Sequence, residues 1–145
     1  MENERLTFRI AQSLDDLLKA FIVRGIVFMG EQHVSYALEK DEHEHAAVHI
    51  LGEAGEEPIA AGRIRFVGEH AKLERLAVRE EWRGLGHGSR LLGFMMDVAR
   101  SRGFAKFKLN AQVTSKVFYL KHGFRVVGET FMEAGMEHCL MLRED

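Results

Sequence analysis

The stretch that decides the fold reads Arg83-Gly84-Leu85-Gly86-His87-Gly88-Ser89. A strand pattern at residues 72–78 precedes it, and an amphipathic helix pattern at residues 89–102 follows it. The first N–H groups of a helix have no partner within the helix, and the helix dipole adds partial positive charge at that end. Glycines let the backbone approach a ligand closely, and the arginine adds a guanidinium group. The turn is therefore expected to bind a phosphate group.

The glycine spacing excludes two common nucleotide sites. A Walker A loop requires Gly-Lys followed by Ser or Thr, and the chain contains no Gly-Lys pair. A dinucleotide fingerprint requires G-x-G-x-x-G, but Ser89 holds the third glycine position counted from Gly84, and Leu91 holds it counted from Gly86. Nucleotide binding therefore becomes a weaker alternative, together with a tight turn that binds nothing.

Strand and helix signals alternate along the rest of the chain. Ser13 followed by Asp16 three residues later indicates a helix start, and Gly25 and Gly30 are expected to divide the apolar run that follows into two helices. Residues 31–45 are polar and acidic, which predicts a loop. Strands are expected at residues 6–10, 46–51, 59–67, 105–109, 124–131 and 137–142, with a shorter helix at residues 113–122.

Length and composition indicate one folded domain over residues 1–145. Apolar residues make up 46% of the chain and charged residues 29%, which is typical of a soluble domain, and a net charge of -2 provides no field that would attract nucleic acid. Cys139 is the only cysteine, so no internal disulfide can form. Without a signal-peptide pattern or an apolar run of ~20 residues, we expect a cytoplasmic protein with no membrane association.

The turn also matches R-x-x-G-x-G, filled by Arg83, Gly86 and Gly88, and here the chain resembles the GNAT superfamily of N-acetyltransferases. The stretch RLAVREEWRGLGHGSRLL at residues 75–92 is similar to the family's fourth strand, pyrophosphate loop and third helix. FYLKHGF at residues 118–124 is similar to its fourth helix and sixth strand. The end of the chain, GETFMEAGMEHCLML at residues 128–142, is similar to a subgroup that includes glyphosate N-acetyltransferase and uncharacterised bacterial relatives.

This resemblance implies an α/β (α+β) fold with a mixed, twisted sheet of roughly seven strands and four helices, splayed between the fourth and fifth strands. The gap would take the pantetheine arm of acetyl-CoA, the cosubstrate, paired with backbone groups of the fourth strand. The implied contacts to acetyl-CoA are Leu76, Ala77, Val78, Arg83, Gly84, Leu85, Gly86, His87, Gly88, Ser89, Asn110, Phe118 and Tyr119.

Acetyl transfer to an amine requires a base, a stabilised oxyanion and a proton for the departing thiolate. Tyr119, five residues before Gly-Phe, occupies the place of the family's proton donor. For the base, His138 matches the histidine of the subgroup, and Glu74 matches the glutamate that other branches use, often through water; both stay open. If β alternation is unbroken, Glu74 shares a face with Leu76 and Val78, although a bulge near the cofactor would upset that register.

The resemblance places the acceptor on the other side of the splayed strands. Arg75 matches a substrate-contacting arginine, which implies an anionic group on the substrate, and Gln112 replaces an arginine of the glyphosate enzyme, which argues against dianions. Arg24 and Gln32 are further substrate-side candidates, with Glu31 beside them. No metal is expected, because the histidines at 43, 45 and 49 have no zinc-like spacing.

The expected partner is therefore a small-molecule primary amine. Acetylation of a peptide or protein amine and a non-catalytic acyl-CoA sensor are the alternatives. A homodimer is compatible with the resemblance, since GNAT proteins often dimerise.

Overall fold

The expected strands join one mixed sheet. The computed structural model describes residues 5–145 and places seven strands in the order β1-β2-β3-β4-β5-β7-β6. Neighbouring strands are antiparallel except for β4 and β5, which are parallel. The strands are β1 (Thr7–Ile10), β2 (Val48–Ala54), β3 (Glu57–Val67), β4 (His70–Val78), β5 (Lys106–Gln112), β6 (Arg125–Glu133) and β7 (Met136–Glu144).

Helices connect these strands and cover both faces of the sheet. The Ser13 side chain accepts a hydrogen bond from the backbone N–H of Asp16, which confirms the predicted N-cap. The helical segments are α1 (Leu14–Arg24), the π-helical η2 (Gly25–Glu31), α2 (Tyr36–Glu39), η3 (Glu80–Trp82), α3 (His87–Ser101), η4 (Val113–Ser115) and α4 (Lys116–Lys121).

Three expectations about the helices were wrong. Gly25 is the C-cap of α1 but does not break the helical run: its backbone is right-handed helical, and η2 follows directly because Val23 and Val27 keep packing on the sheet, with Gly30 inside η2. The stretch 31–45 contains the short helix α2 rather than only loop. The helix expected at 113–122 divides into a 3-10 turn and α4.

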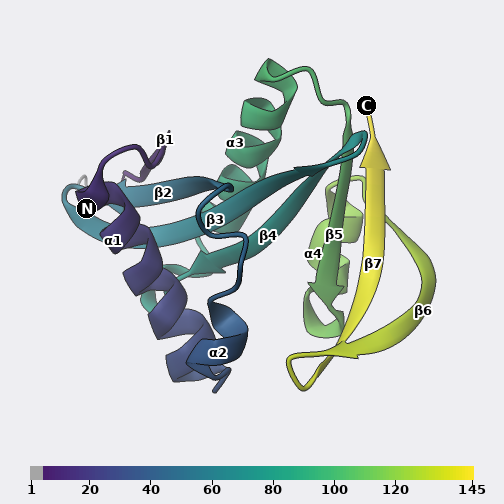
Figure 1. Cartoon of the computed structure of the whole chain (residues 1–145), viewed down its shortest axis with the longest axis horizontal. Coiled ribbons are helices and arrows are strands. Elements are labelled where there is room, and N and C mark those ends of the chain that lie inside the picture. The colour runs from purple at the N-terminus through teal and green to yellow at the C-terminus, as the bar shows by residue number, and fades with distance from the viewer. Residues whose placement is uncertain (1–4) are drawn as a thin grey trace.

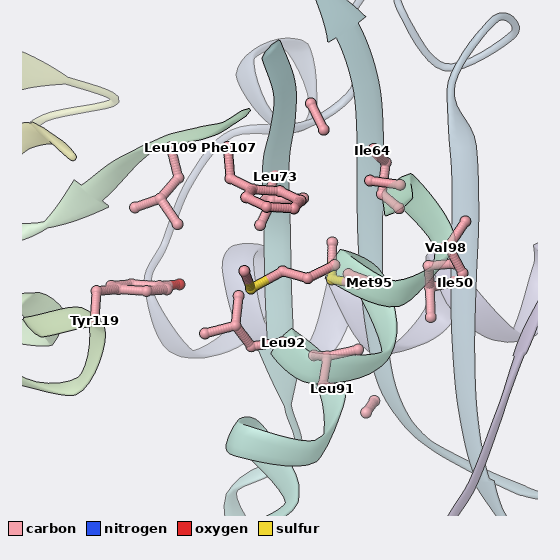
Figure 2. Close-up of a cluster of buried hydrophobic side chains, with 14 of the residues drawn as sticks. Ile50, Ile64, Leu73, Leu91, Leu92, Met95, Val98, Phe107, Leu109 and Tyr119 are labelled. Atoms are coloured by element: carbon pink, nitrogen blue, oxygen red, sulfur yellow. The ribbon is translucent and has the colours of Figure 1, made fainter. Parts of the chain in front are cut away.

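The core has one cluster of buried side chains on each face of the sheet. Figure 2 shows Leu91 and Met95 of α3 close to Leu73 and Ile64 of the central strands. On the other face, α1 and η2 bury small and branched side chains against β2, β3 and β4. Gly62 on β3 allows α3 to lie close, since an added Cβ would stand 2.5 Å from the Met95 sulfur. The two helices therefore fix the central strands between them.

The sheet opens between β4 and β5, as expected from the family resemblance. The parallel ladder joins His70 to Lys106 and, in the described part of the chain, ends where Lys72 faces Lys108. Figure 1 shows the two strands side by side at one end and diverging at the other, with β5, β6 and β7 forming a separate wing. The rest of the β4 edge that faces β5 is therefore left without a strand partner.

A β-bulge interrupts β4 just beyond this ladder. Ala77 pairs with Ala61 and Glu74 pairs with Arg63, so Arg75 and Leu76 together oppose one residue of β3. Arg75 has a φ of 57°, a left-handed conformation that is uncommon for a residue with a Cβ. The unbroken alternation considered above is therefore wrong: Leu76 and Val78 pack with Leu73 on the α3 side, and Ala77 faces α1.

Candidate active site

The glycine turn opens onto a cleft of about 460 Å³, here called the turn cleft. Gly84 and Gly86 have φ values of 80° and 85°, a conformation that glycine adopts without strain. Gly86 is also the N-cap of α3, so the unpaired N–H groups of the first helical turn begin at the cleft wall. The arrangement fits an anionic group such as a diphosphate.

Most of the expected acetyl-CoA contacts lie together in the turn cleft, and three do not. Leu85 is 60% exposed and does not line the cleft. The His87 side chain is buried instead of facing the cleft; burial and then the neighbouring Arg90 lower its pKa. Asn110 lines the opposite side of the opening, where it donates a hydrogen bond to Glu133. The residues that do line the cleft are Leu76, Ala77, Val78, Arg83, Gly84, Gly86, Gly88, Ser89, Phe118 and Tyr119.

Two adjoining polar cavities of about 150 and 300 Å³ lie on the other side of the opening and share eight residues. They are called the acceptor cavities here. The smaller one reaches the turn cleft at Leu76, Ser115 and Tyr119, which line both. A molecule in the cleft and a molecule in the acceptor cavities would therefore meet at the bulge of β4. The shared lining of the two cavities consists of Phe28, Gln32, Lys72, Glu74, Arg75, Gln112, Glu133 and His138.

Tyr119 stands at the junction of the two sides. Its side chain is 9% exposed, and Figure 2 shows it at the margin of the core cluster with the hydroxyl pointing from α4 toward the centre of that cluster. Burial raises the pKa of Tyr119 to about 12, because an apolar environment disfavours the phenolate. The phenol therefore stays protonated at neutral pH and can act as a hydrogen donor.

His138 lies on β7 opposite Phe131 and reaches the wall of both acceptor cavities. It is 5% exposed, and its Nδ1 lies 2.9 Å from the Met136 carbonyl oxygen. Because a carbonyl oxygen only accepts, Nδ1 carries the proton in this contact, and Nε2 is left as the basic nitrogen. The nearest carboxylate oxygen, from Glu133, is 4.0 Å from Nε2.

Glu74 also lies in the acceptor cavities, but its carboxylate is fully engaged. Arg63 and Arg65 both donate to its oxygens at 2.8 Å, and Lys72 is 3.3 Å away. Burial raises the pKa of Glu74, but the hydrogen bond from Arg65 and the charge of Arg63 outweigh burial and lower it to about 2. A carboxylate held this way is a weak base near neutral pH.

Glu74 belongs to an ion network that supports the wall of the acceptor cavities. The network joins five cations to four carboxylates, so it carries one excess positive charge. Lys72 and Arg75, each about one-fifth exposed, line both cavities together with the carboxylates of Glu74 and Glu133. The members are Arg24, Arg63, Arg65, Lys72, Arg75, Glu39, Asp41, Glu44 and Glu74.

The four candidate substrate contacts divide into two kinds. Arg75, Gln32 and Gln112 line both acceptor cavities, and Gln112 donates a hydrogen bond to Gln32 at 2.9 Å. Arg24 is 1% exposed and bonded to Glu39 and to Glu44, and it does not line the acceptor cavities. Its guanidinium holds the loop after α2 in place, which is a structural role and not a contact to the acceptor cavities.

Several cavity residues were not among the sequence candidates. Phe28 projects from the π-helical turn, and Ser115 precedes α4 at the junction of the cavities. Lys72 has no local motif around it. Glu133 does have a signal, because it is the second glutamate of the GETFME segment used for the family resemblance. The described residues contain no group of three His, Cys, Asp or Glu side chains placed to hold a metal.

An opening between two parallel strands, with an anion site on one side and a polar cavity on the other, is the architecture of a protein that brings a donor and an acceptor together. The chain belongs to the GNAT acetyltransferase family: the family model described as "Acetyltransferase (GNAT) domain" matches residues 17–144. A relative in Bacillus subtilis, the protein YjcF, described as an uncharacterized N-acetyltransferase, is 39% identical over 93% of this chain and 97% of its own.

Solved structures agree with this assignment. The Escherichia coli protein ElaA has a TM-score of 0.86 and 25% identity, covering 97% of this chain and 100% of its own. A GNAT family acetyltransferase from Elizabethkingia anophelis, solved with acetyl-CoA bound, has a TM-score of 0.73 at 17% identity, covering 96% of this chain and 97% of its own. No helix within residues 5–145 is long and apolar enough to cross a membrane.

Proposed function

We propose that the protein transfers an acetyl group from acetyl-CoA to the primary amine of a small molecule. The observation that carries this proposal is the junction at Leu76, Ser115 and Tyr119, where the turn cleft and the acceptor cavities meet. The diphosphate would lie on the turn at residues 83–89, and the pantetheine arm along Leu76 to Val78, where β4 lacks a partner on the β5 side. The thioester then reaches the junction.

Residues around the junction supply the base, the oxyanion-stabilising N–H groups and the proton donor that the reaction needs. The amine nitrogen attacks the thioester carbon and gives up a proton to His138 Nε2. Backbone N–H groups freed by the bulge at Arg75 and Leu76 stabilise the developing oxyanion. The C–S bond breaks, and the thiolate takes a proton from Tyr119. Desolvation raises the pKa of a buried thiol as it raises that of Tyr119, which keeps this transfer feasible.

His138 is preferred to Glu74 as the base. Both line the acceptor cavities, but three cations hold the Glu74 carboxylate. Burial raises the pKa of Glu74, but its bonds to these cations outweigh burial and lower the pKa to about 2. The Glu74 carboxylate instead fixes Arg63 and Arg65 against the cavity wall.

Arg75 lines both cavities and matches a substrate-contacting arginine of the subgroup that the chain resembles, which supports an acceptor that carries an anionic group as well as its amine. Lys72 lines both cavities beside it. Cavities of about 150 and 300 Å³ suit a small metabolite better than a folded protein surface.

Release of coenzyme A in the presence of a panel of amines tests the proposal directly. Turnover with a small amine that carries a carboxylate is the expected result. Tight binding of acetyl-CoA without turnover for any acceptor, peptides included, would favour an acyl-CoA sensor. Thermal stabilisation by ATP or NADH, but not by acetyl-CoA, would reject the donor assignment.

A further inference from the structure

One ion pair joins the end of η2 to the glycine turn, across 52 residues of sequence. Arg83 donates from Nη2 to a Glu31 carboxylate oxygen at 2.6 Å and from Nε to the Val78 carbonyl oxygen at 2.8 Å. Arg83 and Val78 both line the turn cleft. A carboxylate of the chain itself therefore occupies the guanidinium that lies beside the expected diphosphate position.

The residue after Glu31 connects the same segment to the opposite side of the opening. Gln32 lines both acceptor cavities and accepts a hydrogen bond from Gln112 on β5. His33 follows with a φ of 59°, a conformation that costs energy in a residue with a Cβ and persists only when neighbouring contacts hold it. Residues 31–33 are thus held by one side-chain contact on the cleft side and one on the acceptor side, besides the backbone hydrogen bond from the Gln32 N–H to the Val27 carbonyl oxygen.

We propose that Glu31 is a positioning residue that competes with the diphosphate of coenzyme A for Arg83, so that filling the turn cleft releases the segment carrying Gln32. This inference rests on the proposed function. The side chains of Arg83 and Glu31 are 44% and 28% exposed, and ion pairs at such exposure contribute little to stability. A diphosphate, with more charge and several acceptor oxygens, displaces the carboxylate.

Isothermal titration with coenzyme A as the probe measures the competition. Glu31→Gln removes the competing charge and is expected to tighten coenzyme A binding about 2- to 5-fold. Arg83→Met is expected to weaken binding about 10-fold. The double variant should match Arg83→Met alone, because Glu31 acts only through that guanidinium.

Glu57→Gln is the matched control. Glu57 pairs with Arg79 at the same 2.6 Å, and neither residue lines the turn cleft, so its affinity for coenzyme A should equal that of the parent. Hydrogen exchange supplies a second readout: saturating coenzyme A should speed exchange at residues 28–35 in the parent and change it little in Glu31→Gln, where the segment is already released.

Equal or weaker binding of coenzyme A by Glu31→Gln, with the parent binding normally, overturns the competition. A parent chain that does not bind coenzyme A at all would instead reject the proposed function, so the two failures are distinguishable.

Discussion

The two sides of the opening are built in different ways. The turn cleft takes its proposed anion site from one short stretch, residues 83–89, and mainly from the backbone N–H groups of that stretch. The acceptor cavities collect side chains from η2, the loop after α2, β4, β5 and the β6–β7 hairpin. A site made from contiguous backbone can be predicted from a short motif. A site made from scattered side chains cannot, because it depends on how the whole sheet opens.

The largest expected effect is a loss of kcat without a change in the affinity for coenzyme A. His138→Gln should lower kcat by roughly 10²- to 10⁴-fold, because the amine loses its proton acceptor, while the Kd for coenzyme A stays unchanged. Steady-state kinetics and calorimetry measure the two quantities. His70→Gln, at the far end of β4, is the control. Parental kcat in His138→Gln would remove His138 from the mechanism.

On the donor side, the largest effect on binding is expected from a change in the backbone of the glycine turn. Gly86→Glu forces a Cβ into a left-handed conformation and adds a negative charge at the anion site, so the Kd for coenzyme A should rise on the order of 100-fold. Gly103→Glu places the same residue at a φ of 89° after the other end of α3 and should keep parental affinity. Unchanged binding by folded Gly86→Glu would contradict the assignment of the turn.

The ion network beside the acceptor cavities should contribute less to the stability of the folded chain in acid. The pKa of Glu74 is lowered to about 2 in the folded chain from the ordinary 4.5, since its pairs outweigh burial. The stability that Glu74 contributes is therefore complete above about pH 4.5 and is lost as the pH falls toward 2. Urea unfolding should show Glu74→Gln about 2 kcal/mol less stable than the parent at pH 7, with a smaller gap at pH 3.

Glu69→Gln, at an exposed position, serves as the control and should differ little from the parent in stability. A Glu74 gap that stays constant from pH 7 to pH 3 would mean that the carboxylate is not held as described.

The smallest effect distinguishes acceptors. Lys72→Met removes one exposed cation from the cavity wall and should raise KM about 5- to 10-fold for an amine that carries a carboxylate. KM for the matching carboxamide should change less than about twofold. Equal changes in KM for both substrates would show that Lys72 does not interact with the negative charge of the acceptor.

The sequence predicted the backbone around the glycine turn well and the side chains of the polar cavities only in part. The glycine turn, the N-cap at Ser13, the long helix and the opening after Lys72 all follow from local patterns or the family resemblance. The π-helical η2 was missed because glycine does not by itself end a helix whose apolar face continues to pack. The inward side chain of His87 was missed because a motif specifies backbone position and leaves rotamers open.

The ion network lay outside what local patterns could show. Arg24 is an acceptor candidate by its place in the sequence, but its carboxylate partners come 15 and 20 residues later in the chain, at the end of α2, which packs against η2, and in the loop after it. Sequence patterns leave both Glu74 and His138 open as the base, because they do not show the three cations that surround Glu74. Environment, rather than residue type, separated these candidates.

The bulge at Arg75 and Leu76 also determines how this segment responds to changes in length. The bulge absorbs one surplus residue in β4 and keeps Ala77 opposite Ala61 and Glu74 opposite Arg63. Deleting one residue there would therefore straighten the strand and leave Ala77 facing α1 and Val78 facing the α3 side. The loss would be local: the left-handed turn at Arg75 would disappear, while both faces of β4 would keep their side chains.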